Sequence, residues 1–176
     1  MADGPNLEGM TAEEQAAYEV YSARAEGTNI HPQTLLATDY LNHFNEAIMM
    51  LELAPQMPEC IDDFCAWRPL SYCAHFAASS FKERDLAISA YGNADPALRR
   101  RLDELADGMN AILLATVAAL RAEPQALGEV AEEALMRLRL LVARAGAVIH
   151  GAETAADEAS EAQATQAAVD ALFAHW

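Results

Sequence analysis

Four side chains in the first half of the chain could bind a metal ion or transfer a proton. Asp39, His43 and Glu46 follow one another at steps of four and three residues, so a helix places them along one side. Helical bundles bind metals through carboxylates and imidazoles that point inward from facing helices. His75, also expected in the middle of a helix, could complete a set for iron, zinc or manganese. The spacing therefore predicts a candidate metal site at these four residues.

Two known kinds of bundle site fit this pattern poorly. Diiron bundles of the ferritin type use Glu-x-x-His on two helices, whereas His43 and Glu46 stand in the reverse order. A histidine that carries a phosphoryl group would be opposed by two neighbouring carboxylates, Asp39 and Glu46. The alternative to a metal site is structural: His43 hydrogen-bonds to a carboxylate such as Asp39 and holds its helix to a neighbour.

Other chemical signals in the sequence are weak. The chain has no glycine-rich phosphate loop, no G-x-S-x-G, no H-E-x-x-H and no dinucleotide-binding fingerprint. Cys60, Cys65 and Cys73 show no C-x-x-C spacing, which argues against a disulfide framework and against a cysteine zinc site. We expect reduced thiols, and the sequence does not decide whether the protein is an enzyme.

The charge of the chain limits its partners. Its 176 residues include 11 basic and 27 acidic side chains, a formal net charge of −16. An acidic surface repels the phosphates of nucleic acids and of anionic membranes. It suits a basic protein partner, with a second copy of the chain as the other option. The basic run Arg99 to Arg101 is expected to pair with Asp103 and Glu104 on its own helix.

Nothing at the N-terminus resembles a secretory signal, because the first ten residues contain neither a basic region nor an apolar stretch. The most apolar run, residues 111–120, is half as long as a membrane span. Together with the expected reduced thiols, these features predict a cytoplasmic protein.

Helical periodicity dominates the chain, and no alternating strand pattern is visible. A central helix over residues 33–53 positions the candidate ligands, and Asp95-Pro96 is a strong start for a helix that runs to residue 122. Two more long helices are expected over residues 124–150 and 154–176. Thr11 and Glu14 predict a capping box at the start of an N-terminal helix. Prolines divide the region between the central helix and Asp95 into short helices, expected over residues 59–67, 71–79 and 82–91.

The sequence thus predicts one all-α domain over residues 11–176, preceded by an irregular arm over residues 1–10. Its architecture is expected to be an antiparallel four-helix bundle with an extra N-terminal helix and a helical crossover over residues 54–95. For function, the sequence favours a non-catalytic accessory or assembly protein that binds another protein. The alternative is a metal- or small-ligand-binding bundle centred on Asp39, His43, Glu46 and His75.

Overall fold

The computed structural model describes residue 7 and residues 9–152. Over these residues the chain is helical, with no β-strand, and the all-α prediction is confirmed. Most of the predicted arm and the predicted helix over residues 154–176 lie outside the described residues. The elements are, in chain order, α1 (Ala12–Ala25), η1 (Thr38–Leu41), α2 (Asn42–Leu53), α3 (Cys60–Ala66), α4 (Tyr72–Ala78), α5 (Arg84–Gly92), α6 (Pro96–Ala122), η2 (Pro124–Ala126) and α7 (Leu127–Ile149), where η marks a 3-10 helix.

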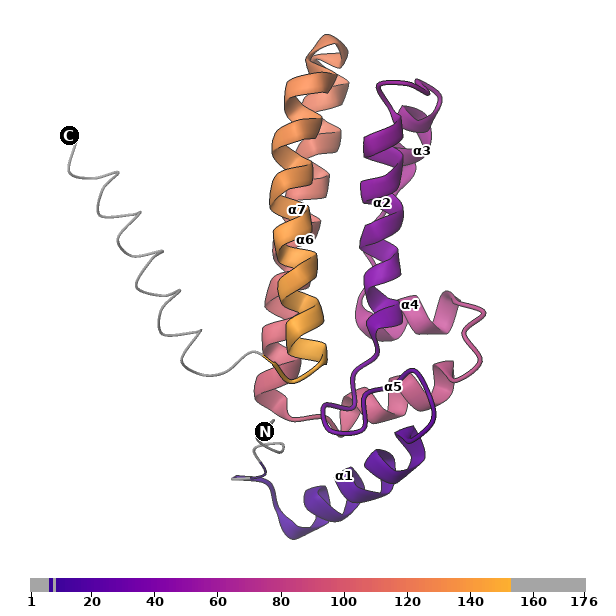
Figure 1. Cartoon of the computed structure of the whole chain (residues 1–176), viewed down its shortest axis with the longest axis vertical. Helices are drawn as coiled ribbons and strands as arrows, with labels where there is room; N and C mark the ends of the chain where they lie inside the picture. The colour runs from indigo at the N-terminus through magenta and orange to yellow at the C-terminus, as the bar shows by residue number, and fades with distance from the viewer. Residues whose placement is uncertain (1–6, 8, 153–176) are drawn as a thin grey trace, which may run out of the picture.

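Three helices stand side by side and form the long part of the molecule (Figure 1). Among the described elements, α6 and α7 make the most extensive contact, and α2 packs against α7. The region predicted as a crossover consists of α3 beside α2, followed by α4 and α5, which lie across the lower end of the long helices. α1 lies beneath α5 and contacts it.

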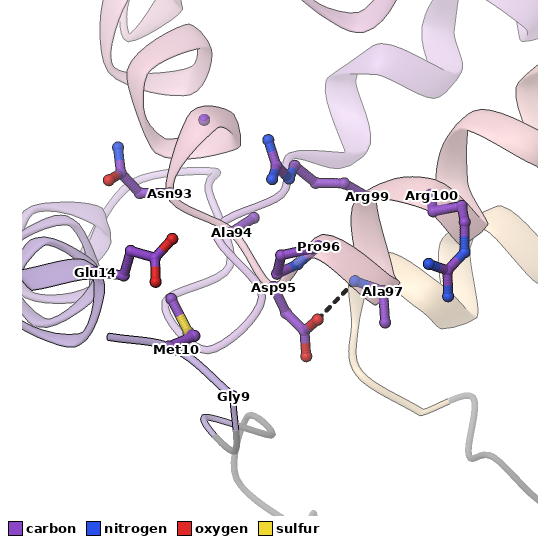
Figure 2. A pocket seen from close by; sticks show the side chains of 11 residues that line it. Gly9, Met10, Glu14, Asn93, Ala94, Asp95, Pro96, Ala97, Arg99 and Arg100 are labelled. Atoms are coloured by element: carbon purple, nitrogen blue, oxygen red, sulfur yellow. Dashed lines mark hydrogen bonds between the residues drawn. The ribbon is translucent and has the colours of Figure 1, made fainter. Parts of the chain in front are cut away.

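Two neighbouring residues, Asp95 and Pro96, determine where α6 begins. The Asp95 side chain accepts a hydrogen bond from the Ala97 backbone N–H at 2.7 Å, and Pro96 occupies the first turn, as Figure 2 shows. Both features are strong helix starts. One face of the helix is then buried at helical spacing by Leu102, Leu105, Met109, Leu113, Val117 and Leu120.

The central helix begins later than its sequence predicts. Residues 31–37 form a non-helical loop; Ile30, just before it, and Ala37 at its end make an isolated antiparallel bridge, and Leu35 has a left-handed backbone with φ of 59°. All four residues from Thr34 to Ala37 are buried. A helix on the surface cannot bury four consecutive side chains, so a loop replaces its first turns and α2 starts only at Asn42.

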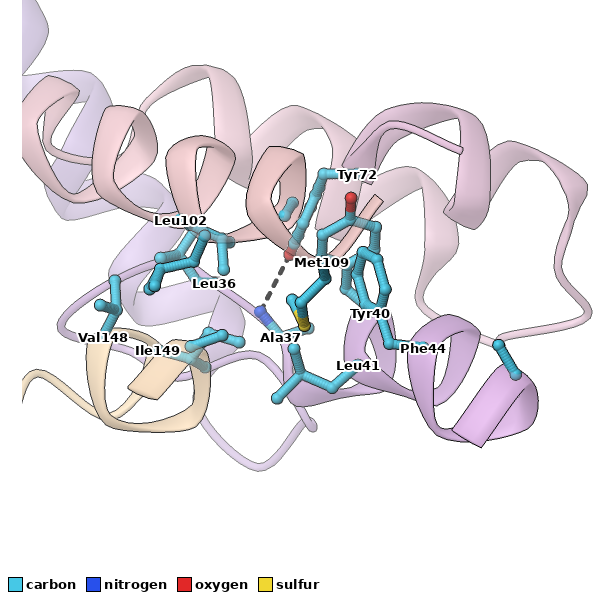
Figure 3. Close-up of a cluster of buried hydrophobic side chains, with 14 of the residues drawn as sticks. Leu36, Ala37, Tyr40, Leu41, Phe44, Tyr72, Leu102, Met109, Val148 and Ile149 are labelled. Carbon is cyan, nitrogen blue, oxygen red and sulfur yellow. Dashed lines mark hydrogen bonds between the residues drawn. The ribbon is translucent and has the colours of Figure 1, made fainter. Parts of the chain in front are cut away.

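Hydrogen bonds tie this loop to distant parts of the chain. The Thr34 hydroxyl donates to the carbonyl oxygen of Ile149 at 2.6 Å, which joins the loop to the last turn of α7. The Ala37 N–H donates to the Tyr72 hydroxyl oxygen at 2.9 Å. Figure 3 shows this bond inside the apolar cluster, with Tyr40 beside it. Tyr72 therefore connects α4 to the loop before α2.

Replacing Tyr72 with phenylalanine should lower the free energy of unfolding by about 1 to 3 kcal/mol. The Ala37 N–H is buried and would lose its acceptor. Urea denaturation followed by circular dichroism measures the change. Tyr21→Phe on α1 is a matched control, because that hydroxyl makes no hydrogen bond to a described residue. Equal losses in the two variants would contradict the role of the Tyr72 hydroxyl.

Candidate functional site

The structure brings the two predicted histidines together. The imidazole of His43 on α2 lies with its centroid 5.8 Å from that of His75 on α4. Trp67, just after α3, stacks on His43 with centroids 4.6 Å apart, and its indole N–H donates to the His43 carbonyl oxygen at 3.2 Å. His43 is only 7% exposed, and its Nε2 has no hydrogen-bond partner among the described residues.

Burial controls the charge of both histidines. It lowers the pKa of His43 to about 4, and the nearby His75 adds to this effect, while a hydrogen bond to the Arg68 backbone opposes it. Burial also lowers the pKa of His75, against the opposing influence of the Asp39 backbone and of the Asp39 and Glu46 carboxylates. At neutral pH both imidazoles are therefore neutral.

The two predicted carboxylates, Asp39 and Glu46, do not join the histidines in a group of metal ligands. Glu46 is exposed on α2 and Asp39 is half-buried in η1. Among the described residues, no three or more His, Cys, Asp or Glu side chains are grouped so that they could hold a metal ion. The geometry therefore gives no support to a metal site at Asp39, His43, Glu46 and His75, although the rings of the two histidines do lie near each other.

A separate pocket of about 420 Å³ lies between α4, α5 and α6, with Tyr40 in its wall. We call it the tyrosine–carboxylate pocket. Among the described residues, no Lys or Arg lines it. Its walls are Tyr40, Pro69, Leu70, Ser71, Tyr72, Cys73, Tyr91, Asp103, Ala106, Asp107 and Asn110.

The three tyrosines of this pocket are held by the fold. Tyr72 stacks on Tyr91 with ring centroids 4.5 Å apart, and Tyr40 lies 5.3 Å from Tyr72. The Tyr40 hydroxyl donates to the Leu70 carbonyl oxygen at 3.0 Å. The Tyr91 hydroxyl donates to the Asp103 carboxylate at 2.7 Å. The aromatic rings are thus fixed beside the carboxylates of α6 before any ligand arrives.

Two carboxylates, Asp103 and Asp107, supply negative charge to the pocket, and the Arg99 guanidinium, 5.8 Å from the centroid of the Tyr91 ring, partly offsets it. Burial raises the pKa of Tyr91, and its hydrogen bond to Asp103 raises it further. Burial raises the pKa of Tyr40, with additional contributions from the Asp103 and Asp107 charges. The pKa of Cys73 is raised in the same way, by burial and by Asp103. Burial, the largest cause in each case, disfavours any charge on these groups; the smaller contributions of Asp103 and Asp107 are the ones that favour a positive ligand.

One polar atom of the pocket has no hydrogen-bond partner among the described residues. Asn110 lines the pocket on α6, and its side-chain oxygen is buried without a hydrogen bond to a described residue. A buried acceptor left unpaired costs about 1 to 3 kcal/mol. A ligand that carries N–H donors could satisfy it.

A second pocket, of about 330 Å³, lies at the start of α6 (Figure 2). The N–H groups of a helix N-terminus attract anions, and Arg99 and Arg100 are nearby. Here, however, the Asp95 carboxylate already accepts a hydrogen bond from this first turn, and Glu14 adds a second negative charge to the lining. This pocket is consequently a poor anion site.

The residues of the tyrosine–carboxylate pocket were mostly missed from the sequence. Asp103 was expected to pair with arginines one turn before it, but it accepts from Tyr91 instead, and the arginine pairs form with Glu104. The available signal was the spacing of Asp103, Asp107 and Asn110, which places them on one side of a helix. The three cysteines are free thiols and half-buried.

Comparisons of the chain with protein-family models, with curated proteins and with solved structures find no match.

Proposed function

We propose that the protein is a non-catalytic accessory protein that binds a basic protein partner and holds one of its Arg or Lys side chains in the tyrosine–carboxylate pocket. One observation carries this proposal: two carboxylates and three tyrosine rings line the pocket, and its described walls include no Lys or Arg, although Arg99 lies over the Tyr91 ring beside them. A cation over an aromatic face gains about 0.5 to 2 kcal/mol. Carboxylates beside the ring add charge-assisted hydrogen bonds.

The chemistry of a guanidinium or ammonium group matches each part of this pocket. Its positive charge suits the negative charge of Asp103 and Asp107. Its N–H donors suit the unpaired side-chain oxygen of Asn110. The net charge of −16 would also attract a basic macromolecule from a distance and raise the rate of association.

A separate surface favours a protein partner over a free amine. Met49 and Leu53 on α2 are 53% and 37% exposed, and Met136 and Leu140 on α7 are 68% and 61% exposed. Each pair is four residues apart, so its members share a helix face. The contact between Glu52 and Arg139 joins the two helices beside these side chains. Exposed apolar side chains gathered in this way are typical of protein-binding surfaces.

The test uses a capped arginine peptide as the probe and the same peptide with neutral citrulline as its control, both titrated by calorimetry. The arginine peptide should bind and the citrulline peptide should not. Asp103→Asn with Asp107→Asn should weaken arginine binding at least about tenfold, which corresponds to roughly 1.4 kcal/mol. Binding should also weaken as salt is added.

Asp62→Asn is the matched control, because Asp62 is an exposed carboxylate on α3 outside the pocket. Its affinity for the arginine peptide should stay within about twofold of the wild type, as isolated surface charges contribute little. Equal binding of the two peptides, or equal losses in the two variants, would overturn the assignment of the pocket.

A further inference from the structure

The C-terminal half of α6 has more apolar surface than the described residues cover. Of the described helices, α6 alone has the length and apolar composition to cross a membrane, a criterion that core helices of soluble proteins also meet. Only 39% of its most apolar 18-residue window is buried. Leu114 is 46% exposed, and Ala111, Ala115 and Ala118 are exposed as well. A helix that is apolar on all sides is normally covered on all sides.

The uncovered surface is shaped to receive a helix. A groove of about 430 Å³ runs between α6 and α7. Ala111, Ala115 and Ala119 line it from α6, and Val130 and Ala134 line it from α7. Small side chains at four-residue steps let another helix approach closely. The ion pair between Arg137 and Glu133 borders the groove.

We propose that residues 153–176 of the same chain occupy this groove as the fourth helix of the bundle. α7 ends at Ile149, and Gly151 just beyond it has a left-handed backbone with φ of 67°, while the Ala152 N–H donates back to the Ala147 carbonyl oxygen at 2.9 Å. This C-terminal motif stops the helix and lets the chain change direction. The next 24 residues are therefore tethered at the end of α7.

The spacing of apolar residues in this segment matches the position of the groove. Val169, Leu172, Phe173 and Trp176 follow helical steps of three, one and three residues, so they share one face. A helix from residue 153 reaches Val169 after about 24 Å at 1.5 Å per residue. Measured back along α7 from Ile149, Ala134 lies about 22 Å away by the same rise. An antiparallel fourth helix thus brings its large apolar side chains level with the groove.

The same spacing explains why the first part of the segment needs no large side chains. Residues 153–168 contain seven alanines among 16 residues; the others are Ser, Thr, Gln and acidic residues, and none has a large apolar side chain. In the proposed packing they lie level with the lower half of α7, below the groove. In this arrangement the apolar residues of the segment therefore lie level with the apolar groove of α6 and α7 along the bundle axis.

Trp176 provides the test, because the chain has only two tryptophans. Subtracting the emission of Trp176→Phe from that of the wild type isolates the Trp176 signal without altering Trp67. A docked Trp176 should emit at short wavelength and resist quenching by acrylamide. Ala115→Glu places a charge in the groove and should shift the emission to the red and raise the quenching constant several-fold.

Ala143→Glu is the matched control, since Ala143 is exposed on α7 and does not line the groove; it should leave Trp176 protected. If Ala115→Glu unfolds the protein, hydrogen exchange on a chain that ends at residue 168 replaces it, and exchange at residues 111–119 should accelerate at least tenfold. A fully quenchable Trp176 in the wild type, or unchanged exchange in the shortened chain, would overturn the proposal. So would sedimentation showing that protection of Trp176 depends on a dimer, because a second copy would then fill the groove.

Discussion

Replacing Trp67 with alanine should lower the free energy of unfolding by about 3 to 5 kcal/mol, the usual cost of removing a large buried aromatic side chain. Trp67 is 7% exposed, stacks on His43 and lies 6.3 Å from Phe44 between ring centroids. Its indole N–H also donates a hydrogen bond to the His43 carbonyl oxygen, which joins the end of α3 to α2. Most domains are stable by only about 5 to 15 kcal/mol, so this variant should be close to unfolding at 37 °C.

Urea denaturation followed by far-ultraviolet circular dichroism measures this loss. Trp67→Phe is the informative companion, because it keeps an aromatic ring against His43 but removes the N–H donor. It should cost less than half as much as the alanine variant. A loss below about 1 kcal/mol for Trp67→Ala, the size of an ordinary surface effect, would show that the ring does not support the fold.

The stability of the protein should fall as the pH is lowered from 6.5 to 4, largely through His43. Burial lowers the pKa of His43 in the folded protein to about 4, from an ordinary value of 6.5. Well above pH 6.5 the imidazole is neutral in both states and adds no pH dependence. Below pH 6.5 the unfolded chain binds a proton that the folded protein excludes, so stability falls by up to about 1.4 kcal/mol per pH unit. Near pH 4 the folded protein also binds it, and the loss levels off at about 3 kcal/mol.

The groups that face His43 shape this dependence. The pKa of His75, which faces His43, is also lowered by burial and adds to the same trend; so does the pKa of His31, which lies against His150 elsewhere in the fold. Asp39 and Glu46 act on His75 in the opposite direction. Urea midpoints of the wild type and of His43→Gln, measured between pH 4 and 8, isolate the contribution of His43. The difference between the two proteins should be constant above pH 7 and shrink below pH 6.5; a constant difference down to pH 4 would contradict a buried neutral His43.

Local signals in the sequence predicted those elements whose limits are set within a few residues. Asp95 and Pro96 start α6 where expected, and the capping box of Thr11 and Glu14 forms as predicted. The loop over residues 31–37 could not be predicted in this way. Its conformation depends on the hydrogen bond from Thr34 to Ile149, and these partners are separated by 115 positions in the sequence.

In the candidate site, too, the sequence predicted features within one helix but not the contacts between helices. The sequence named His43 and His75 as possible ligands of one metal site because each was expected in the middle of a helix. The structure places their ring centroids 5.8 Å apart, a contact that the spacing within either helix did not predict. The sequence could not show that Trp67 would stack on His43, nor that Tyr91 would reach Asp103. The contact of Trp67 depends on how α3 lies against α2, and the contact of Tyr91 depends on how α5 lies against α6. The sequence of a single helix does not encode how it packs against another.

Leu35 places two opposite demands on one position. Its left-handed backbone favours glycine or asparagine, whereas its complete burial favours a large apolar side chain. Glycine would relieve about 1 to 2 kcal/mol of backbone strain but forfeit roughly 2 to 5 kcal/mol of packing. Valine and isoleucine, branched next to the backbone, tolerate positive φ worst of all. Few substitutions can satisfy both demands, so intolerance to change at Leu35 would reflect the architecture of the loop, and it should not be mistaken for the mark of a binding residue.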